Sequence, residues 1–319
     1  MPSISASAPA KIILLGEHAV VYNQPAIAFP VPAVRARAAI LANPLGKPGE
    51  VEITSRQVQL QTSLDQLPPE HALQHLFTAF RQETGINQLP AMKVTISSEI
   101  PVAAGMGSGA AVSVALLKAL GLFIGLSFSS AQLAGMAFEA EKAYHGNPSG
   151  IDNTVIAYEK PVYYQKDEPI SFLTLPANLH LLVASSGIPA QTIATVSAVR
   201  SRMERFPEET GAIIEHIGAL VRQARVYVET GDAASLGQVC MQNHSLLMQL
   251  GVSTPELDNL VSAAVNAGAL GAKLTGGGGG GNILALVDLE NQAAVMDSLN
   301  KAGAENVLPA TIRKTAVYG

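Results

Sequence analysis

The sequence is poor in cysteine, tryptophan and charged residues. It has one cysteine, Cys240, and no tryptophan. A single cysteine excludes an intrachain disulfide framework or a cysteine-based metal site within one chain, and it fits a reducing compartment. Charged residues make up 14% of the chain and the net charge is −5, which argues against nucleic acid or an anionic membrane as the main partner. We therefore expect a cytoplasmic protein that holds any anionic substrate through local positive features.

We also expect no segment that targets the chain to a membrane. Residues 1–9 lack a basic start and an apolar centre, so we expect no secretory signal. The run 108–126 approaches membrane-spanning length, but it carries Lys118 and lies between polar loops, which favours a buried helix and no membrane partner. Because 48% of the 319 residues are hydrophobic, the chain is long and apolar enough for two domains.

A glycine-rich turn at residues 101–111 reads Pro-Val-Ala-Ala-Gly-Met-Gly-Ser-Gly-Ala-Ala. It follows a strand predicted at 92–98 and opens an apolar helix predicted to reach about residue 124. The glycines let the backbone turn sharply, and the first helical turn presents unpaired N–H groups to an oligophosphate. A tight connection without a ligand is the alternative. The turn is not a P-loop, because Gly-Lys-Ser/Thr is missing, and it is a weak dinucleotide fingerprint.

Two candidate sites carry carboxylates. Glu17 and His18 follow a short buried strand, a typical position for a site, with a solvated turn as the alternative. Asp152 lies at the start of a helix predicted at 151–158, after the loop from residue 145. Asp152 is a candidate base, but Asp152 or Asn153 could equally cap that helix.

Two further patterns have simpler interpretations. His71 and His75 have metal-ligand spacing on a predicted helix, but no third ligand is in view, which favours a solvated face. Six consecutive glycines at 276–281 precede a strand predicted at 282–287. Such a run is costly in backbone entropy, so we expect close packing against a ligand or another loop instead of a flexible linker.

Three stretches together resemble the motifs of the GHMP kinase superfamily, and the resemblance covers the chain from end to end. They are Pro9–Tyr22, with Gly-Glu-His-Ala-Val-Val from residue 16, Pro101–Ala111, and Lys273–Gly281. Within the superfamily, the first stretch and the segments 145–153 and 243–253 are most similar to mevalonate kinases. Phosphomevalonate kinases usually have tyrosine where His18 stands.

The resemblance implies an α+β fold of two domains. The first, over residues 1–175, would be a ribosomal protein S5 domain 2-like domain that holds the phosphate loop and the catalytic aspartate. The second, over 176–319, would be a ferredoxin-like domain that carries the glycine-rich third motif.

The implied activity is ATP-dependent phosphorylation of the 5-hydroxyl of mevalonate to 5-phosphomevalonate in isoprenoid precursor biosynthesis, with Mg²⁺ as the metal. Another kinase of the superfamily, acting on phosphomevalonate or a sugar, is the first alternative. A non-catalytic protein that senses nucleotide and ligand is the second, and the retention of both Lys11 and Asp152 argues against it. A homodimer is compatible with the sequence, which does not fix the oligomeric state.

The resemblance also implies residue roles. Asp152 would be the catalytic base, and Lys11 would lower the pKa of the substrate hydroxyl or stabilise its developing charge. Glu141 and Ser108 would bind Mg²⁺. The substrate side would include Glu17, His18, Thr192 and Gly277. The ATP phosphates would lie on Ala104, Gly105, Met106, Gly107, Ser108, Gly109, Ala110 and Ala111.

The sequence departs from the family pattern at two positions. The second motif usually reads Gly-Leu-Gly-Ser-Ser, and its second serine is commonly assigned to Mg²⁺; here that position is Gly109, which leaves Ser108 or a water as the ligand. The segment 191–195, usually containing Ser-Thr-Lys, reads Gln-Thr-Ile-Ala-Thr. Thr192 is retained and the lysine is missing, so the strength of substrate or inhibitor binding is expected to differ.

Overall fold

The computed structural model describes residues 3–101, 105–145 and 149–315. These residues pack as two compact units. The first unit is built from segments of 1–10, 32–101 and 107–159, and the second from segments of 11–31, 102–106 and 160–319. Strands β1 (Ile4–Leu15) and β2 (Ala26–Ala42), which pair with each other, contribute residues to both units.

The first unit contains a sheet in the order β4-β3-β5-β2. Its further strands are β3 (Val51–Ser55), β4 (Leu60–Ser63) and β5 (Met92–Ser98). β3 and β5 run parallel, whereas β2 and β5 run antiparallel. Along β5, buried and exposed residues alternate, because successive side chains of a strand point to opposite faces. One face of the sheet therefore belongs to the core.

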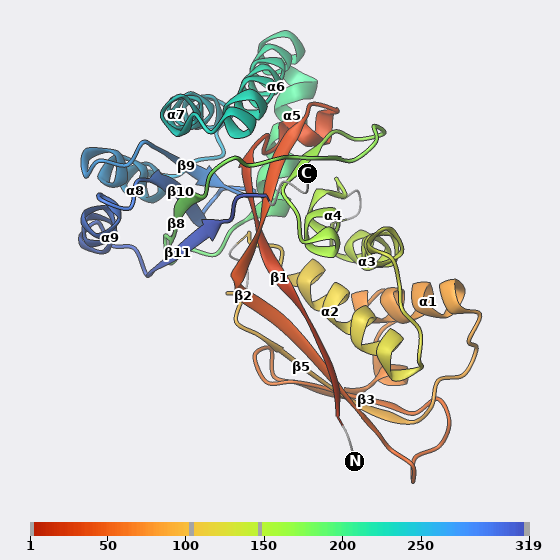
Figure 1. Cartoon of the computed structure of the whole chain (residues 1–319). Coiled ribbons are helices and arrows are strands. Elements are labelled where there is room, and N and C mark those ends of the chain that lie inside the picture. The colour runs from red at the N-terminus through yellow and green to blue at the C-terminus, as the bar shows by residue number, and fades with distance from the viewer. Residues whose placement is uncertain (1–2, 102–104, 146–148, 316–319) are drawn as a thin grey trace. The chain divides into compact units, whose positions relative to one another are not determined.

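Helices cover that face in Figure 1. They are α1 (Ala72–Thr84), α2 (Ser108–Phe123), α3 (Ser130–His145) and α4 (Ile151–Tyr158), with a short 3-10 turn, η2 (Leu64–Gln66), before α1. Most residues of α2 are buried, which confirms the buried helix expected from its sequence. No helix among the described residues has the length and apolar character needed to span a membrane.

The second unit contains a four-stranded sheet in the order β11-β8-β10-β9. The strands are β8 (Leu179–Ser185), β9 (Gly271–Thr275), β10 (Asn282–Val287) and β11 (Asn306–Ile312), and all neighbours are antiparallel. Helices connect β8 to β9, and α9 (Gln292–Lys301) connects β10 to β11. This order and connectivity are those of the ferredoxin-like arrangement that the sequence implied.

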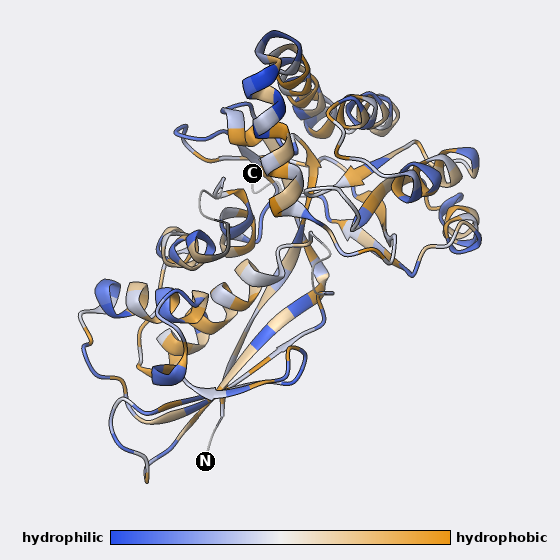
Figure 2. Ribbon diagram, turned by 180° about the vertical axis from the view of Figure 1, so that it is seen from behind, coloured by the Kyte–Doolittle hydropathy of each residue, from blue (hydrophilic) through white to orange (hydrophobic). Residues whose placement is uncertain are grey.

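The connecting helices are α5 (Thr192–Arg205), α6 (Pro207–Thr230), α7 (Ala233–Gln249) and α8 (Pro255–Asn266). α7 packs on β9, and α8 packs on β9 and β10. These helices carry both hydrophobic and hydrophilic residues in Figure 2, as expected for helices with one buried face. The unit also includes η1 (Ala19–Tyr22), β6 (Val162–Tyr164), which pairs with the start of β2, and β7 (Ser171–Phe172).

Two predicted strands differ from the structure. The single strand expected over 51–60 is interrupted by a turn in which Gln59 has a φ of 50°, so it forms β3 and β4. The sequence also predicts a last strand at 310–318, of which residues 316–318 lie outside the described residues; the strand found there, β11, covers 306–312. Pro309 falls inside it, which is tolerated because β11 is an edge strand and one side of its backbone needs no ladder partner.

Candidate active site

The turn after β1 places Glu17 in the interior of the second unit. Gly16 has a φ of 102°, and a Cβ there would lie 2.6 Å from the Cα of Ala26, so only glycine fits. The Glu17 side chain is 1% exposed and forms an ion pair with Lys273, which is fully buried on β9. The solvated Glu-His turn considered from the sequence is therefore wrong.

A buried polar cluster surrounds this ion pair. Lys273 Nζ also donates to the carbonyl oxygen of Leu274, and Asn243 Nδ2 on α7 donates to Glu17 Oε2 at 3.2 Å. Burial raises the pKa of the Glu17 carboxyl, and attraction to the Lys273 ammonium partly opposes that rise. The same burial raises the pKa of the Cys240 thiol to about 12, so this cysteine is not a nucleophile at neutral pH.

His18 is buried and has an unusual backbone. Its φ is 61° and its ψ is −45°, a region that non-glycine residues rarely occupy. Its Nε2 lies 2.9 Å from the carbonyl oxygen of Gly277. Since a carbonyl only accepts, Nε2 must carry the proton. Burial lowers the pKa of the His18 ring, and the bond to Gly277 partly offsets this, so the ring is neutral at pH 7 with Nδ1 as its acceptor.

The six-glycine run is closely packed. Five of its residues have positive φ, namely Gly276 and Gly278 to Gly281. A Cβ at Gly277 would lie 2.6 Å from Thr192 Oγ1, and one at Gly278 would lie 2.1 Å from the carbonyl oxygen of Val252. The prediction that packing requires these glycines is confirmed. The structure also brings three of the predicted substrate residues together in this unit: His18, Gly277 and Thr192.

The glycine turn at 105–107 approaches the six-glycine run. A Cβ added at Gly276 would lie 3.4 Å from the Cα of Gly105, so the backbones of these two glycines lie against each other in the second unit. The N–H of Lys11 donates to the carbonyl oxygen of Met106 at 3.0 Å, which fixes the turn to β1. Ala104, also predicted to bind phosphate, lies outside the described residues.

Gly107 begins α2 as its N-cap, with a φ of 71° and no side-chain cap. The N–H of Ala111 is bonded to the carbonyl oxygen of Gly107 at 2.9 Å. By helix geometry the amides of Ser108, Gly109 and Ala110 have no acceptor inside the helix. These three amides at the positive end of the helix dipole are the anion-binding groups that α2 offers, whereas the Ala111 amide is already used.

Gly109 leaves space beside a buried carboxylate of the first unit. A Cβ at Gly109 would lie 3.3 Å from Glu141 Oε1, and Glu141 on α3 is 6% exposed. Among the described residues no group of three or more His, Cys, Asp or Glu side chains is placed to hold a metal ion. A single carboxylate next to the first turn of a helix fits Mg²⁺, which is usually held by one or two carboxylates together with substrate phosphates and water.

Asp152 lies in the first turn of α4 but does not cap it. The N-cap is Gly150, with a φ of 86°, and the N–H of Ile151 donates to Ser149 Oγ at 3.4 Å. Asn153 Nδ2 instead donates to the carbonyl oxygen of Ala134 at 2.8 Å. The capping alternative for Asp152 and Asn153 is therefore wrong, and Asp152 is left partly exposed at the positive end of a short helix. The other predicted catalytic residue, Lys11, is 3% exposed on β1.

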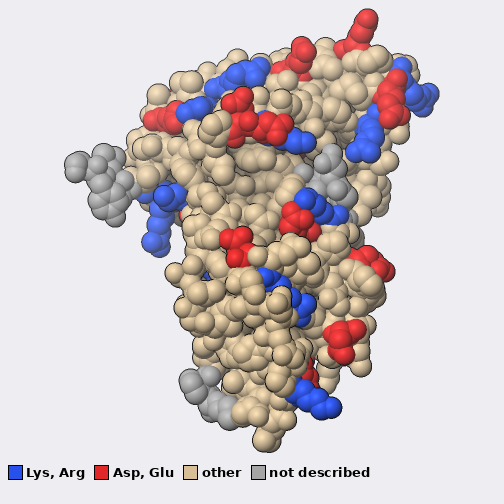
Figure 3. Space-filling view, turned by 90° about the vertical axis from the view of Figure 1, so that its right-hand side faces the viewer, with Lys and Arg blue, Asp and Glu red and all other residues tan. Residues whose placement is uncertain are grey.

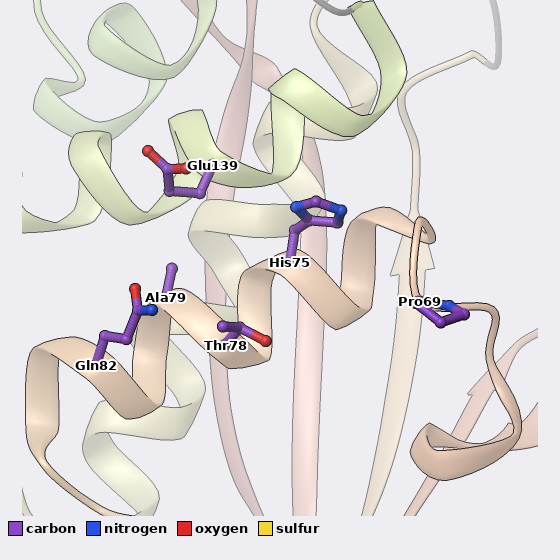
Figure 4. A pocket seen from close by; sticks show the side chains of 6 residues that line it. All are labelled: Pro69, His75, Thr78, Ala79, Gln82 and Glu139. Atoms are coloured by element: carbon purple, nitrogen blue, oxygen red, sulfur yellow. The ribbon is translucent and has the colours of Figure 1, made fainter.

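The two histidines of α1 are not part of any group of three or more candidate metal ligands among the residues that the structure describes. His71 is the N-cap of α1, where its Nδ1 accepts from the N–H of Leu73 at 3.2 Å. His75 lines a pocket of about 220 Å³ that Figure 4 shows between α1 and Glu139 of α3. None of the residues predicted to bind nucleotide, metal or substrate lines this pocket.

Charged side chains of both signs are mixed on one face of the molecule. On the face shown in Figure 3, Lys and Arg side chains lie among Asp and Glu, separated by wide uncharged areas. Sequence reasoning assigned no role to Lys273 or Asn243, although a lysine inside an otherwise apolar strand was an available signal.

Comparisons with known proteins agree with this geometry. The model of the GHMP kinases N-terminal domain matches residues 71–160, and that of the GHMP kinases C-terminal domain matches residues 217–305. The chain belongs to the GHMP kinase family.

Its relatives include mevalonate kinases. The enzyme of Pyrococcus horikoshii is 38% identical over 305 residues, which cover 89% of this chain and 88% of that protein. The enzyme of Thermococcus sibiricus is 37% identical, with 94% of this chain and 93% of that protein covered. The crystal structure of L. major mevalonate kinase in complex with R-mevalonate has a TM-score of 0.83 and 26% identity, with 98% and 97% of the two chains covered.

Proposed function

We propose that this protein transfers the γ-phosphoryl group of ATP to the 5-hydroxyl of mevalonate, giving 5-phosphomevalonate and ADP in isoprenoid precursor biosynthesis. The observation that carries the proposal is the match to mevalonate kinases across about nine-tenths of the chain. The neutral His18 ring beside Gly277 and Thr192 supports it, because a neutral imidazole accepts a hydrogen bond from a polyhydroxylated acid.

We assign the proton transfer to Asp152. Its carboxylate takes the proton of the 5-hydroxyl as that oxygen forms a bond to the γ-phosphorus, and the bond from phosphorus to the β,γ-bridging oxygen breaks to release ADP. The Lys11 ammonium stabilises the negative charge that develops on the substrate oxygen. What supports this assignment is the position of Asp152 in the segment 145–153, which resembles that of mevalonate kinases, and in the first turn of α4.

We assign the phosphate groups of ATP to the residues from Gly105 to Ala110, through the amides of the first turn of α2. Glu141 would hold Mg²⁺, with Ser108 as a candidate hydroxyl ligand and water in the space that Gly109 leaves. When bound, this metal neutralises charge on the phosphates. The protein's own contribution is to align the hydroxyl and the phosphates, since phosphoryl transfer needs little covalent chemistry from it.

The domain division that we propose ends the N-terminal domain near residue 175. We also propose that the protein acts in the cytoplasm, where a free cysteine stays reduced. A homodimer is compatible with the reaction and is not required by it.

A coupled assay of ADP release with ATP, Mg²⁺ and mevalonate tests the proposal. We expect turnover with mevalonate and formation of a phosphate monoester, detected by phosphorus NMR. Phosphomevalonate, galactose and homoserine serve as the comparison substrates under the same conditions. Clear turnover of one of these without turnover of mevalonate would reassign the protein to another activity of the family. Binding of nucleotide with no turnover of any substrate would favour the sensor alternative.

A further inference from the structure

The Glu17 side chain is the anchor of an otherwise strained turn. Gly16 and His18, on either side of it, have φ values of 102° and 61°. The turn's own backbone bonds join Val20 N–H to the carbonyl of Gly16 and Val21 N–H to that of His18, each at 3.0 Å. A non-glycine residue at positive φ persists only when its surroundings hold it there, so the contacts of the neighbouring Glu17 carboxylate matter for His18.

Those contacts come from two other elements of the second unit. Lys273 lies in the middle of β9, opposite Leu284 of β10, and its ammonium donates to Glu17 Oε1. Asn243 lies on α7, and its amide donates to Glu17 Oε2 at 3.2 Å. Each carboxylate oxygen thus has its own donor, and a strand and a helix fix the carboxylate in place.

The strand that holds Glu17 also leads into the loop that holds His18. Four residues after Lys273, Gly277 accepts the Nε2–H of the His18 ring. The side chain of Glu17 and the ring of His18 are therefore bound to one continuous segment. Lys273 and Asn243 are themselves 0% exposed, so neither can touch a substrate directly.

We infer that Lys273 and Asn243 are positioning residues: by holding the Glu17 carboxylate they keep His18 in its left-handed conformation with its ring on the Gly277 carbonyl. The consequence for catalysis rests on the proposed function, but the consequence for His18 does not. Loss of either donor lets the turn relax, which frees the ring to change its tautomer and orientation.

Nitrogen NMR of the histidine rings tests the inference on the ligand-free protein. The His18 signals are assigned by their loss in His18→Gln. In the unaltered protein we expect the Nε2–H tautomer at neutral pH. In Lys273→Met and Asn243→Ala we expect the His18 nitrogens to move toward the averaged values of a free ring. Leu236→Ala is the matched control, because it empties a buried position of α7 that makes none of these contacts.

Kinetics supply a second measurement. In both variants we expect kcat/KM for mevalonate to fall about 10- to 100-fold, as for other small misplacements of a binding group, while the KM for ATP stays within about twofold of the original value. The Leu236→Ala substitution should lower the melting temperature but change neither the His18 NMR signals nor kcat/KM for mevalonate.

The variants remain informative if one of them is unstable. Removing one member of a buried ion pair leaves an uncompensated charge, whereas replacing both by neutral groups is often tolerated. If Lys273→Met does not fold, the double variant Glu17→Gln with Lys273→Met replaces it in the NMR measurement, because it leaves no unpaired charge. Asn243→Ala needs no such replacement, because it keeps the ion pair intact. Unchanged His18 signals in the folded variants, with a loss of melting temperature only, would overturn the inference. If no mevalonate turnover is found, the proposed function fails and the NMR result still decides the role of Lys273 and Asn243.

Discussion

Replacing Asp152 by asparagine separates a catalytic role from a structural one. Asparagine has nearly the same size and keeps one oxygen, but it cannot take a proton at neutral pH. Gly150, not Asp152, is the N-cap of α4, and asparagine keeps an oxygen that can accept the same hydrogen bonds. What it removes from the folded protein is a negative charge near the positive end of a helix of eight residues.

The two roles predict different magnitudes. Loss of a charge in the first turn of a helix costs about 0.3–1 kcal/mol of stability. For a domain of this size that lowers the melting temperature by at most about 4 °C. Loss of a general base costs about 10²–10⁴-fold in rate, which is at least about 2.7 kcal/mol in activation free energy. We therefore expect a folded Asp152→Asn protein whose kcat is lower by at least about a hundredfold.

The assay measures kcat by coupled ADP release, the melting temperature by calorimetry and ATP binding by titration. Glu256→Gln is the matched control, since Glu256 is an exposed carboxylate in the first turn of α8; its kcat should not change. Lys11→Met should also lower kcat, and the double variant should lose much less than the sum if the two groups act together. An Asp152→Asn enzyme with unchanged kcat would refute the assignment and leave the reaction without a base.

Three further predictions concern the metal, the glycine loop and acid stability. Glu141→Gln should raise the Mg²⁺ concentration needed for ATP binding, measured by titration, and the metal assignment is wrong if neither this change nor Ser108→Ala alters the requirement. Gly278→Ala should lower the free energy of unfolding, measured with denaturant, by at least about 2 kcal/mol. Gly251→Ala is the control and should cost less, because Gly251 has nearly the same φ but nothing lies within 4 Å of its added Cβ. Equal losses would show that the close packing is unimportant. Burial lowers the pKa of the His18 ring in the folded protein, so as the pH falls the ring is protonated in the unfolded chain before it is protonated in the folded one. The free energy of unfolding should therefore decline below about pH 6.5 by up to about 1.4 kcal/mol per pH unit. His18→Gln should make that decline shallower, and an unchanged slope would contradict the burial argument.

Local patterns in the sequence were enough to predict much of the fold. The strand predicted at 92–98 and the helix predicted at 151–158 after a loop marked by glycine and proline have the ranges of β5 and α4 in the structure. These signals are local, because a strand with one buried face and a helix with a defined start are encoded in neighbouring residues. The order of motifs along the chain likewise predicted the family.

What the sequence could not predict depended on partners far along the chain. Glu17 was expected on the substrate side, and the sequence did not indicate that its carboxylate binds Lys273, which is 256 residues away. No local pattern reveals such a pair, because a buried charge is tolerated only where the tertiary structure supplies its counter-charge. The edge position of β11, which allows Pro309 inside a strand, is also decided only when the sheet assembles.

The glycines show both kinds of information in one segment. The sequence alone determined that residues 276–281 must be close to something, since such a run is otherwise too costly in entropy. Only the tertiary structure decided what lies there: Thr192 at Gly277, Val252 at Gly278 and the turn at Gly105 beside Gly276. The physical reason is that a missing side chain is visible in the sequence, whereas the atoms that would collide with it belong to other segments of the folded chain.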